Sequence, residues 1–159
     1  MNANYLIVVG VDGSEGSRRA LAWAANEAAT RGGSVRAVVA WSWDGLEYGP
    51  VAATYPQEAA QRARQLLDRE IKALNDQPGP QAQAQVAGEV IEGRPADVLT
   101  AAGRSADLLV LGSHGHSRVR HTVLGSVSEE CIRKASCPVL VIPMPVEHRE
   151  PAHQSVRRG

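Results

Sequence analysis

Apolar residues along the chain follow two alternating patterns. Short, nearly unbroken apolar runs are typical of strands buried on both faces, as in a parallel sheet. Such runs, together with one looser alternating run, occupy residues 5–11, 35–41, 84–90, 107–111 and 138–142. Between them, apolar residues recur with the period of an amphipathic helix. This second pattern predicts helices at residues 17–31, 58–75 and 126–135, and a short helix that opens at the Gly93-Arg94-Pro95 turn.

The order of these elements alternates between strand and helix. Strands joined by helices at this spacing imply right-handed crossovers and a parallel sheet. We therefore predict an α/β fold: a single three-layer sandwich domain over residues 1–143, with a five-stranded parallel sheet. Residues 144–159 lack a core pattern and are predicted to form a flexible C-terminal tail. Ser14 or Ser17 can cap the first helix, Gly32-Gly33 ends it, and Ser126 is expected to cap the last helix.

Composition narrows the function classes. The chain has 17 basic and 17 acidic side chains, and this balance argues against bulk nucleic-acid binding, which needs a basic face. No apolar run approaches the roughly 18 residues of a membrane-spanning helix, and the N-terminus lacks the features of a signal peptide. We therefore expect a cytoplasmic protein without membrane or nucleic-acid partners. The spacing of Cys131 and Cys137 fits neither a zinc knuckle nor a CxxC pair, so both are expected to be small buried side chains.

Candidate chemistry is concentrated where two predicted strands end. In an open α/β sheet, ligands bind beyond the carboxyl ends of the strands. Residues 10–14 (GVDGS) follow the first strand, and residues 112–118 (GSHGHSR) follow the fourth. The second segment leads to residues 125–128 (GSVS) at the start of the last helix. Because the first and fourth strands are expected to be sheet neighbours, these segments are expected to meet.

The glycines and hydroxyls of these segments suit a phosphate chain. Glycines let the backbone approach phosphate oxygens closely, and a helix N-terminus adds unpaired N–H groups and partial positive charge. Gly125 at a helix start supplies both, and the hydroxyls of Ser126 and Ser128 can donate as well. Arg118 could neutralise phosphate charge or be solvated. The alternative is that the glycines only form a turn and precede a helix cap, but their combination with serine and arginine favours the phosphate site.

Asp12 has two open interpretations. An aspartate directly after a strand often caps the helix that follows. Alternatively, its carboxylate accepts hydrogen bonds from a ribose hydroxyl or from the edge of an adenine. The common nucleotide motifs do not decide between them, since the chain has neither the Walker A sequence GxxxxGK[ST] nor the dinucleotide fingerprint GxGxxG.

The spacing of three glycines carries a family resemblance. Two residues separate Gly112 from Gly115, and nine residues then lead to Gly125-Ser126. This spacing matches the G-2x-G-9x-G-(S/T) signature of ATP-binding universal stress proteins. Over residues 4–143 the chain also resembles this family in its opening VGVDGS, its ADLLVLGSHG strand and loop, and its closing CPVLVIP strand. It resembles the ATP-binding branch of the family more than the branch that lacks these glycines.

The resemblance implies an adenine nucleotide alpha hydrolase-like, Rossmann-like fold that binds ATP, either alone or together with Mg²⁺. By similarity, Asp12 should meet the ribose, residues 38–40 the adenine, and the glycines the phosphates. The residues expected to bind the nucleotide are Gly10, Val11, Asp12, Val39, Ala40, Gly112, Ser113, His114, Gly115, His116, Ser117, Arg118, Gly125, Ser126, Val127 and Ser128. No catalytic residue is expected among them.

Three histidines lie on the same loop: His114, His116 and His121. They could face phosphate, face solvent or bind a metal ion. No cysteine or carboxylate accompanies them in ligand-like spacing, so no metal site is expected. Trp41 and Trp43, after the second strand, could be packing anchors or could border the adenine pocket.

The resemblance favours a nucleotide-dependent regulator in the stress response. The alternatives are a slow ATPase and a cyclic-AMP-binding protein of the same fold. Hydrolysis would need a group that activates water near the phosphates, and only histidines are candidates on the loop. An RNA-binding KH interpretation of Gly-Ser-His-Gly is rejected, because a KH loop lies between two helices whereas this loop follows a buried strand.

The last strand suggests an assembly. Residues 139–142 are apolar on both faces, and at a sheet edge their unpaired backbone groups would be a template for another strand. A two-fold axis would let this strand pair with its own copy, between Pro138 and Pro143, which cannot donate ladder hydrogen bonds. The family resemblance implies the same homodimer. The alternative is an internal strand covered by helices, which would leave the protein monomeric.

Overall fold

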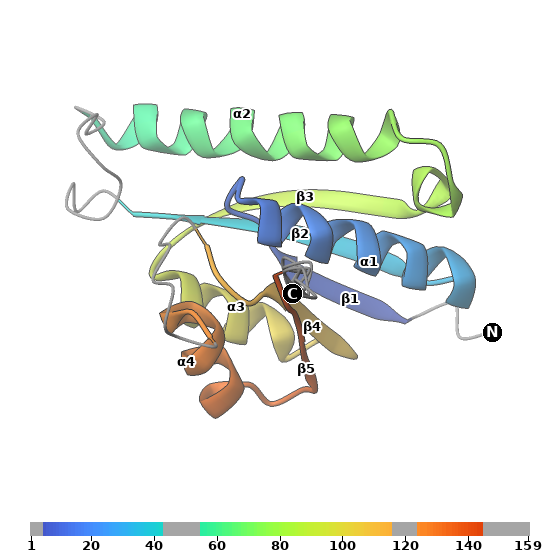
Figure 1. Ribbon diagram of the computed structural model, residues 1–159. Coiled ribbons are helices and arrows are strands. Elements are labelled where there is room, and N and C mark those ends of the chain that lie inside the picture. Colours follow the sequence, from blue (N-terminus) through green and yellow to red (C-terminus); the bar gives the residue numbers. More distant parts are fainter. Residues whose placement is uncertain (1–4, 43–54, 116–123, 145–159) are drawn as a thin grey trace, which may run out of the picture.

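The computed structural model describes residues 5–42, 55–115 and 124–144 (Figure 1). Five strands alternate with four α-helices and one short 3-10 helix in these residues. Their order is β1 (Leu6–Gly10), α1 (Glu15–Arg31), β2 (Ser34–Trp41), α2 (Pro56–Asn75), η1 (Pro80–Gln83), β3 (Gln85–Glu92), α3 (Pro95–Gly103), β4 (Leu108–Gly112), α4 (Ser126–Lys134) and β5 (Val139–Ile142). The predicted alternation of strand and helix is confirmed.

The strands form one parallel sheet in the order β3-β2-β1-β4-β5. The predicted five-stranded parallel sheet is therefore confirmed, as is the pairing of β1 with β4, in which Val9 lies opposite Val110. The chain runs outward from β1 to β3, then crosses back to β4 on the other side of β1. Ligands of open α/β sheets bind at such a reversal, beyond the carboxyl ends of the strands.

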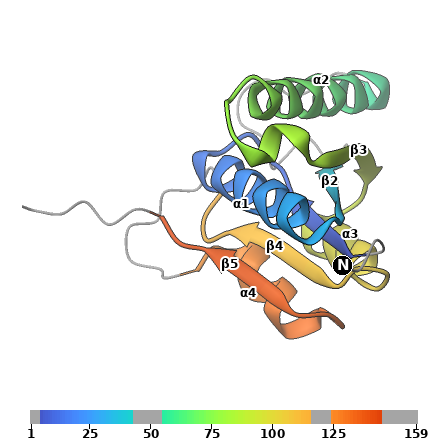
Figure 2. The same ribbon diagram turned by 90° about the vertical axis from the view of Figure 1, so that its right-hand side faces the viewer.

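Helices cover both faces of the sheet, as Figures 1 and 2 show. α1 and α2 lie on one face, and α3 and α4 on the other. Side chains of a strand point alternately to opposite faces. Thus Ile7 and Val9 are buried under α1 and α2, whereas Val8 between them is buried under α3 and α4. Burial on both faces is why β1 is an unbroken apolar run.

The ends of α1 follow from local chemistry. The Oγ of Ser14 accepts a hydrogen bond from the N–H of Ser17 at 3.2 Å, so Ser14 is the N-cap and the helix begins at Glu15, ahead of the predicted start. At the other end Gly32 adopts a left-handed conformation (φ 69°), which glycine tolerates without steric cost. The sequence had left Ser14 and Ser17 as equal candidates for the cap.

Two predicted helix starts need correction. Ser126 is the first residue of α4 and makes no capping bond, whereas Gly125 occupies the N-cap position. α2 begins at Pro56, ahead of its predicted start at residue 58, because proline suits the first turn of a helix, where its missing N–H costs nothing. Residues 43–54 and the predicted tail beyond Met144 lie outside the described residues.

Cys131 is fully buried between α4 and the sheet, and Cys137 is partly buried. Both are free thiols. Burial raises the pKa of the Cys131 thiol to about 11, so this side chain stays neutral and packs as a small apolar group. In the part of the chain that the structure describes, no helix has the length and apolarity that spanning a bilayer requires.

Candidate functional site

The loops after β1 and β4 meet at the carboxyl edge of the sheet. A Cβ atom added to Gly115 would lie 2.6 Å from Oδ2 of Asp12, so these two predicted site residues lie directly against each other. They are about a hundred positions apart in sequence, and the pairing of β1 with β4 brings them together. Their proximity is the first geometric requirement of a site shared by both loops.

Gly112 is needed for packing between backbones. A Cβ atom at Gly112 would lie 2.6 Å from the carbonyl carbon of Gly16, and one at Gly16 would lie 2.8 Å from the carbonyl oxygen of His114. The first turn of α1 therefore rests directly on the β4 loop. Sequence analysis missed Gly16, although a glycine in the first turn of a helix, where it lowers helix propensity, indicates such close contact.

Gly10 is also a packing position. A Cβ atom there would lie 2.9 Å from side-chain atoms of Leu99 and Leu111, on the α3 side of the sheet. Gly13 has a different requirement, because its φ of 80° is a conformation that other residues rarely adopt. It allows the chain to turn sharply between Asp12 and the N-cap Ser14.

Asp12 organises its own loop. Its Oδ1 accepts a hydrogen bond from the N–H of Ser14 at 2.9 Å, and its N–H donates to Oγ of Ser17 at 3.3 Å. The helix cap is Ser14, so the interpretation of Asp12 as the N-cap of α1 is wrong. One carboxylate oxygen thus holds the turn, while the other faces Gly115.

The N-terminus of α4 lies beside these two loops; the space between the β1 loop, the β4 loop and this helix end is called the crevice below. The N–H of Gly125 donates to the carbonyl of Ser113 at 2.5 Å, and a Cβ atom on Gly125 would lie 3.1 Å from that oxygen. The first intrahelical bond of α4 runs from Glu129 to the carbonyl of Gly125. Helix geometry leaves the N–H groups of the preceding residues without an intrahelical acceptor, and they carry the positive end of the helix dipole.

Several predicted site side chains are directed elsewhere. Ser128 is 4% exposed, and its hydroxyl donates to the carbonyl of Gly112 at 2.7 Å, so it ties α4 to the end of β4. Val11 is buried in the α1–α2 core, and Val127 packs toward the α3–α4 core. Their side chains are therefore taken up by contacts within the protein. Ser126 is exposed at the helix start, where its hydroxyl remains accessible.

The end of β2 presents backbone groups to the same crevice. The carbonyl of Val38 accepts from the N–H of Val11, and the carbonyl of Trp41 accepts from the N–H of Gly93, both at 2.8 Å. The backbone N–H and C=O groups of successive β2 residues thus point alternately toward β1 and β3. Those of Ala40 point toward the β1 side, as those of Val38 do. Because β1 ends opposite Val38, the N–H and C=O of Ala40 point into the space beyond the end of β1.

The side chains at this end of β2 pack inward. Val39 is 5% exposed and belongs to the core under α1 and α2, and Trp41 packs against that core, which supports the interpretation of Trp41 as a packing anchor. His116, Ser117, Arg118, His121 and Trp43 lie outside the described residues. Among the residues that are described, no group of three or more histidine, cysteine, aspartate or glutamate side chains could hold a metal ion.

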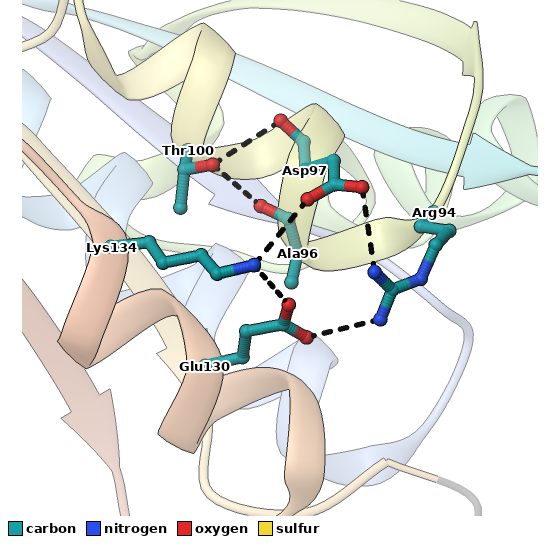
Figure 3. Close-up of polar contacts among 6 residues, drawn as sticks. All are labelled: Arg94, Ala96, Asp97, Thr100, Glu130 and Lys134. Atoms are coloured by element: carbon teal, nitrogen blue, oxygen red, sulfur yellow. Dashed lines mark hydrogen bonds and ion pairs between the residues drawn. The ribbon is translucent and has the colours of Figure 1, made fainter.

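A network of four charged side chains joins the start of α3 to α4 (Figure 3). Lys134 Nζ lies 2.6 Å from Glu130 Oε1 and 3.8 Å from Asp97 Oδ1. Arg94 completes the ring, 3.4 Å from Glu130 and 3.6 Å from Asp97. Since the N-terminus of α4 borders the crevice, this network helps to fix the orientation of that helix.

The network should make stability depend on pH. The hydrogen bond from Lys134 holds the pKa of the Glu130 carboxyl below its ordinary value of 4.5. A lowered folded-state pKa stabilises the native state above that value, and the contribution is lost as pH falls through the folded-state pKa. Between about pH 5.5 and about pH 3.5, the unfolding free energy of wild type should therefore fall more than that of Glu130→Gln.

Urea denaturation of both proteins across this range measures the difference. The matched control is Glu129→Gln, an exposed neighbour that joins no ion pair with the described residues. Glu129→Gln should follow the wild-type pH dependence. Equal acid sensitivity of wild type and Glu130→Gln would show that the network contributes nothing to the stability of the fold.

Comparison with known proteins agrees with this architecture. A sequence model described as the universal stress protein family matches residues 6–143. A universal stress protein of Mycobacterium tuberculosis (strain CDC 1551 / Oshkosh) is 33% identical over 169 aligned positions, which cover 98% of this chain and 53% of that protein. One of Mycolicibacterium smegmatis is 32% identical, with coverage of 87% and 48%. The chain spans about half the length of these curated relatives.

Solved structures share the fold. A universal stress protein family member from Burkholderia pseudomallei is 25% identical, with a TM-score of 0.66 and coverage of 91% of this chain and 99% of that one. A universal stress protein from Archaeoglobus fulgidus in complex with dAMP has a TM-score of 0.60 at 24% identity, covering 89% of this chain and 98% of its own. The family match spans all five strands and four α-helices. The chain therefore belongs to the universal stress protein family.

Proposed function

We propose that this protein binds an adenine nucleotide, with ATP as the expected ligand, in the crevice between the loops of β1 and β4, and that it acts as a nucleotide-dependent regulator in the stress response. One observation carries the proposal: Gly115 faces the carboxylate of Asp12 beside the N-terminus of α4. A carboxylate, a glycine loop and a helix N-terminus at one strand-order reversal are complementary to the ribose and phosphates of a nucleotide.

The phosphates would occupy the end of the crevice at α4. Free N–H groups in the first turn of a helix bind anions, and the helix dipole adds to the attraction. The absence of a Cβ at Gly115 and Gly125 lets their backbone approach Asp12 and Ser113 closely, so backbone groups gather at this end. The exposed hydroxyl of Ser126 adds a donor at the same helix start. The G-2x-G-9x-G-S spacing supports a chain of phosphates, and thus ATP, as the ligand.

The nucleoside would lie between Asp12 and the end of β2. The oxygen of Asp12 that faces Gly115 is positioned to accept hydrogen bonds from ribose hydroxyls. The backbone N–H and C=O of Ala40 form a donor–acceptor pair of the kind that an adenine edge requires. Among the related structures, one is a universal stress protein in complex with cAMP (24% identical, TM-score 0.63) and another holds dAMP. Both ligands are adenine nucleotides, which supports this class.

Cyclic-AMP binding and slow ATP hydrolysis are the second candidates. The cAMP-bound relative favours the first. Hydrolysis needs a group that orients water at the γ-phosphate, and residues 112–125 contain histidines but no carboxylate. This composition favours retention of ATP over turnover.

The nucleotide itself tests the proposal. The protein is purified, denatured and analysed by mass spectrometry for released nucleotide, and nucleotide-free protein is titrated calorimetrically with ATP, ADP, cyclic AMP and GTP. Tighter binding of ATP than of GTP is expected. Tighter binding of cyclic AMP would select the second candidate, and release of inorganic phosphate from bound ATP would identify an ATPase. Absence of binding by all four would refute the nucleotide site.

A homodimer through β5 is part of the same proposal. β5 is an edge of the sheet, since it pairs with β4 alone among the described strands, and its four side chains are only half-buried. Exposed apolar side chains lie close in sequence on either side of it, at Ile132 and Met144. Edge strands with apolar side chains favour pairing with another chain.

Val141→Lys should dissociate this dimer. A charge in the middle of the short strand would be buried on pairing, which is unfavourable unless a partner compensates it. Light scattering should give about twice the chain mass of 16.9 kDa for wild type and the chain mass for the variant. Gln65→Lys, an exposed position of α2, is the matched control and should stay dimeric. A wild-type mass of one chain at micromolar concentration would refute the dimer.

A further inference from the structure

Ser113 is a junction of three chain segments. It is 3% exposed, and its N–H donates to the carbonyl of Ile142 at 2.9 Å. Its hydroxyl oxygen accepts from the N–H of Met144 at 3.2 Å, and its carbonyl accepts from the N–H of Gly125 at 2.5 Å. A single buried serine thus connects the end of β4, the start of α4 and the chain that leaves β5.

Two bonds of Ser113 hold the chain at Ile142 and Met144, just after β5. Pro143 has no N–H, so Met144 carries the first N–H after Ile142 that can be tied down. Ser113 holds the chain on both sides of this proline. Arg19 of α1 holds the proline itself, because its Nη1 donates to the Pro143 carbonyl at 2.5 Å. The chain continues for fifteen residues beyond Met144.

The remaining bonds of Ser113 belong to the proposed phosphate site. Its carbonyl orients Gly125 at the N-terminus of α4, and it lies between Gly112 and Gly115 on the β4 loop. The hydroxyl of Ser128 binds the carbonyl of Gly112, which holds the same turn from the other side. A ligand that accepts a hydrogen bond from the N–H of Gly125 therefore competes with the carbonyl of Ser113 for this donor.

We infer that Ser113 is a positioning residue that couples nucleotide occupancy to the path of the chain leaving β5. This inference rests on the proposed nucleotide site. Its hydroxyl faces Met144 and the ring of His114, whose Nδ1 lies 3.1 Å away, so the side chain orients protein segments and leaves ligand contact to the backbone. Coupling free energy is reciprocal, so if ATP changes the stability of the Met144 contact, that contact in turn affects ATP affinity.

Amide exchange of Met144 tests the coupling. Isotope-labelled full-length protein is examined by NMR without ligand and with saturating ATP. In wild type, ATP should change the exchange rate of the Met144 amide by a factor of about 3 to 10, the scale of one hydrogen bond. In Ser113→Ala the amide should exchange faster without ligand, and ATP should no longer change the rate. Ser113→Thr, which keeps the hydroxyl, should restore the response.

Thr100→Val is the matched control. It also removes one hydroxyl bond of a partly buried side chain, from Thr100 Oγ1 to the Ala96 carbonyl within α3, but it leaves Met144 and the phosphate loop untouched. It should lower stability and still show the ATP-dependent change at Met144, which separates coupling from general loosening. If wild type binds ATP while Met144 exchange stays constant, or if Ser113→Ala keeps the full response, the coupling is overturned and the nucleotide site stands. If wild type binds none of ATP, ADP, cyclic AMP and GTP, both are overturned.

Discussion

Gly115→Val is expected to abolish measurable nucleotide binding while the protein remains folded. The first side-chain atom at this position would already lie 2.6 Å from the Asp12 carboxylate, so the valine must displace the group proposed to bind the ribose. Its methyl groups would also occupy the space proposed for the phosphates. We expect an affinity loss of at least about a hundredfold, equivalent to about 3 kcal/mol. Calorimetric titration with ATP measures it.

Stability should change little, because Gly115 is exposed on a loop and fills no core space. Gly125→Val should lose affinity too, but with a larger cost in stability, since its Cβ would crowd the Ser113 carbonyl at 3.1 Å. The matched control is Gly103→Ala at the C-terminal end of α3. There a Cβ atom would lie 3.2 Å from Cys137 Sγ, so stability should fall and ATP affinity should stay unchanged. Near-normal affinity in both valine variants would refute the phosphate site.

Asp12→Ala should weaken ATP binding by about 1.5–3 kcal/mol, the scale of hydrogen bonds to a charged group. The loss has a direct and an indirect component in this structure. One carboxylate oxygen faces the crevice, and the other accepts the N–H of Ser14 and holds the turn. Removing both oxygens therefore loosens the loop as well as deleting a ligand contact.

Asp12→Asn separates the two components. An amide oxygen can still accept the Ser14 N–H, so the turn and the stability should be largely kept, whereas the charge toward the crevice is lost. ATP affinity should then fall nearly as far as in Asp12→Ala, while the unfolding free energy falls by less. If affinity in both variants equals that of wild type and only stability changes, Asp12 has a structural role alone.

The strongest agreement between sequence and structure concerns β1 and β4. Their unbroken apolar runs predicted burial on both faces, and Ile7, Val8 and Val9 are each fully buried, on alternating sides. The alternation of strands with helices predicted the parallel sheet and the location of a site beyond its carboxyl ends. From that expectation, Asp12 and Gly115 were named as residues of one site, and the structure brings them into direct proximity.

The sequence-based expectations agreed less well with the structure wherever a polar group could form a hydrogen bond with more than one partner. Ser126 and Gly125 are adjacent, and the serine has the better intrinsic preference for the N-cap. Gly125 occupies it because its N–H is taken by the carbonyl of Ser113, and its lack of a Cβ allows that close approach. Ser128 was expected to face a ligand, yet its hydroxyl is committed to Gly112. The residue type shows that a hydroxyl can donate a hydrogen bond, but it does not show which acceptor the hydroxyl will bind.

By itself, the sequence determined which segments are strands and helices, and which chemical groups stand at the strand ends. These properties depend on local periodicity and residue type, which can be read along the chain. Only the tertiary structure decided that Gly16 rests on Gly112 and that Ser113 holds both Gly125 and Met144. Such contacts depend on how closely α1 and α4 pack against the end of β4. That distance is set by the packing of the whole core. The contacts at these positions join segments that are remote in sequence, so they cannot be read along the chain.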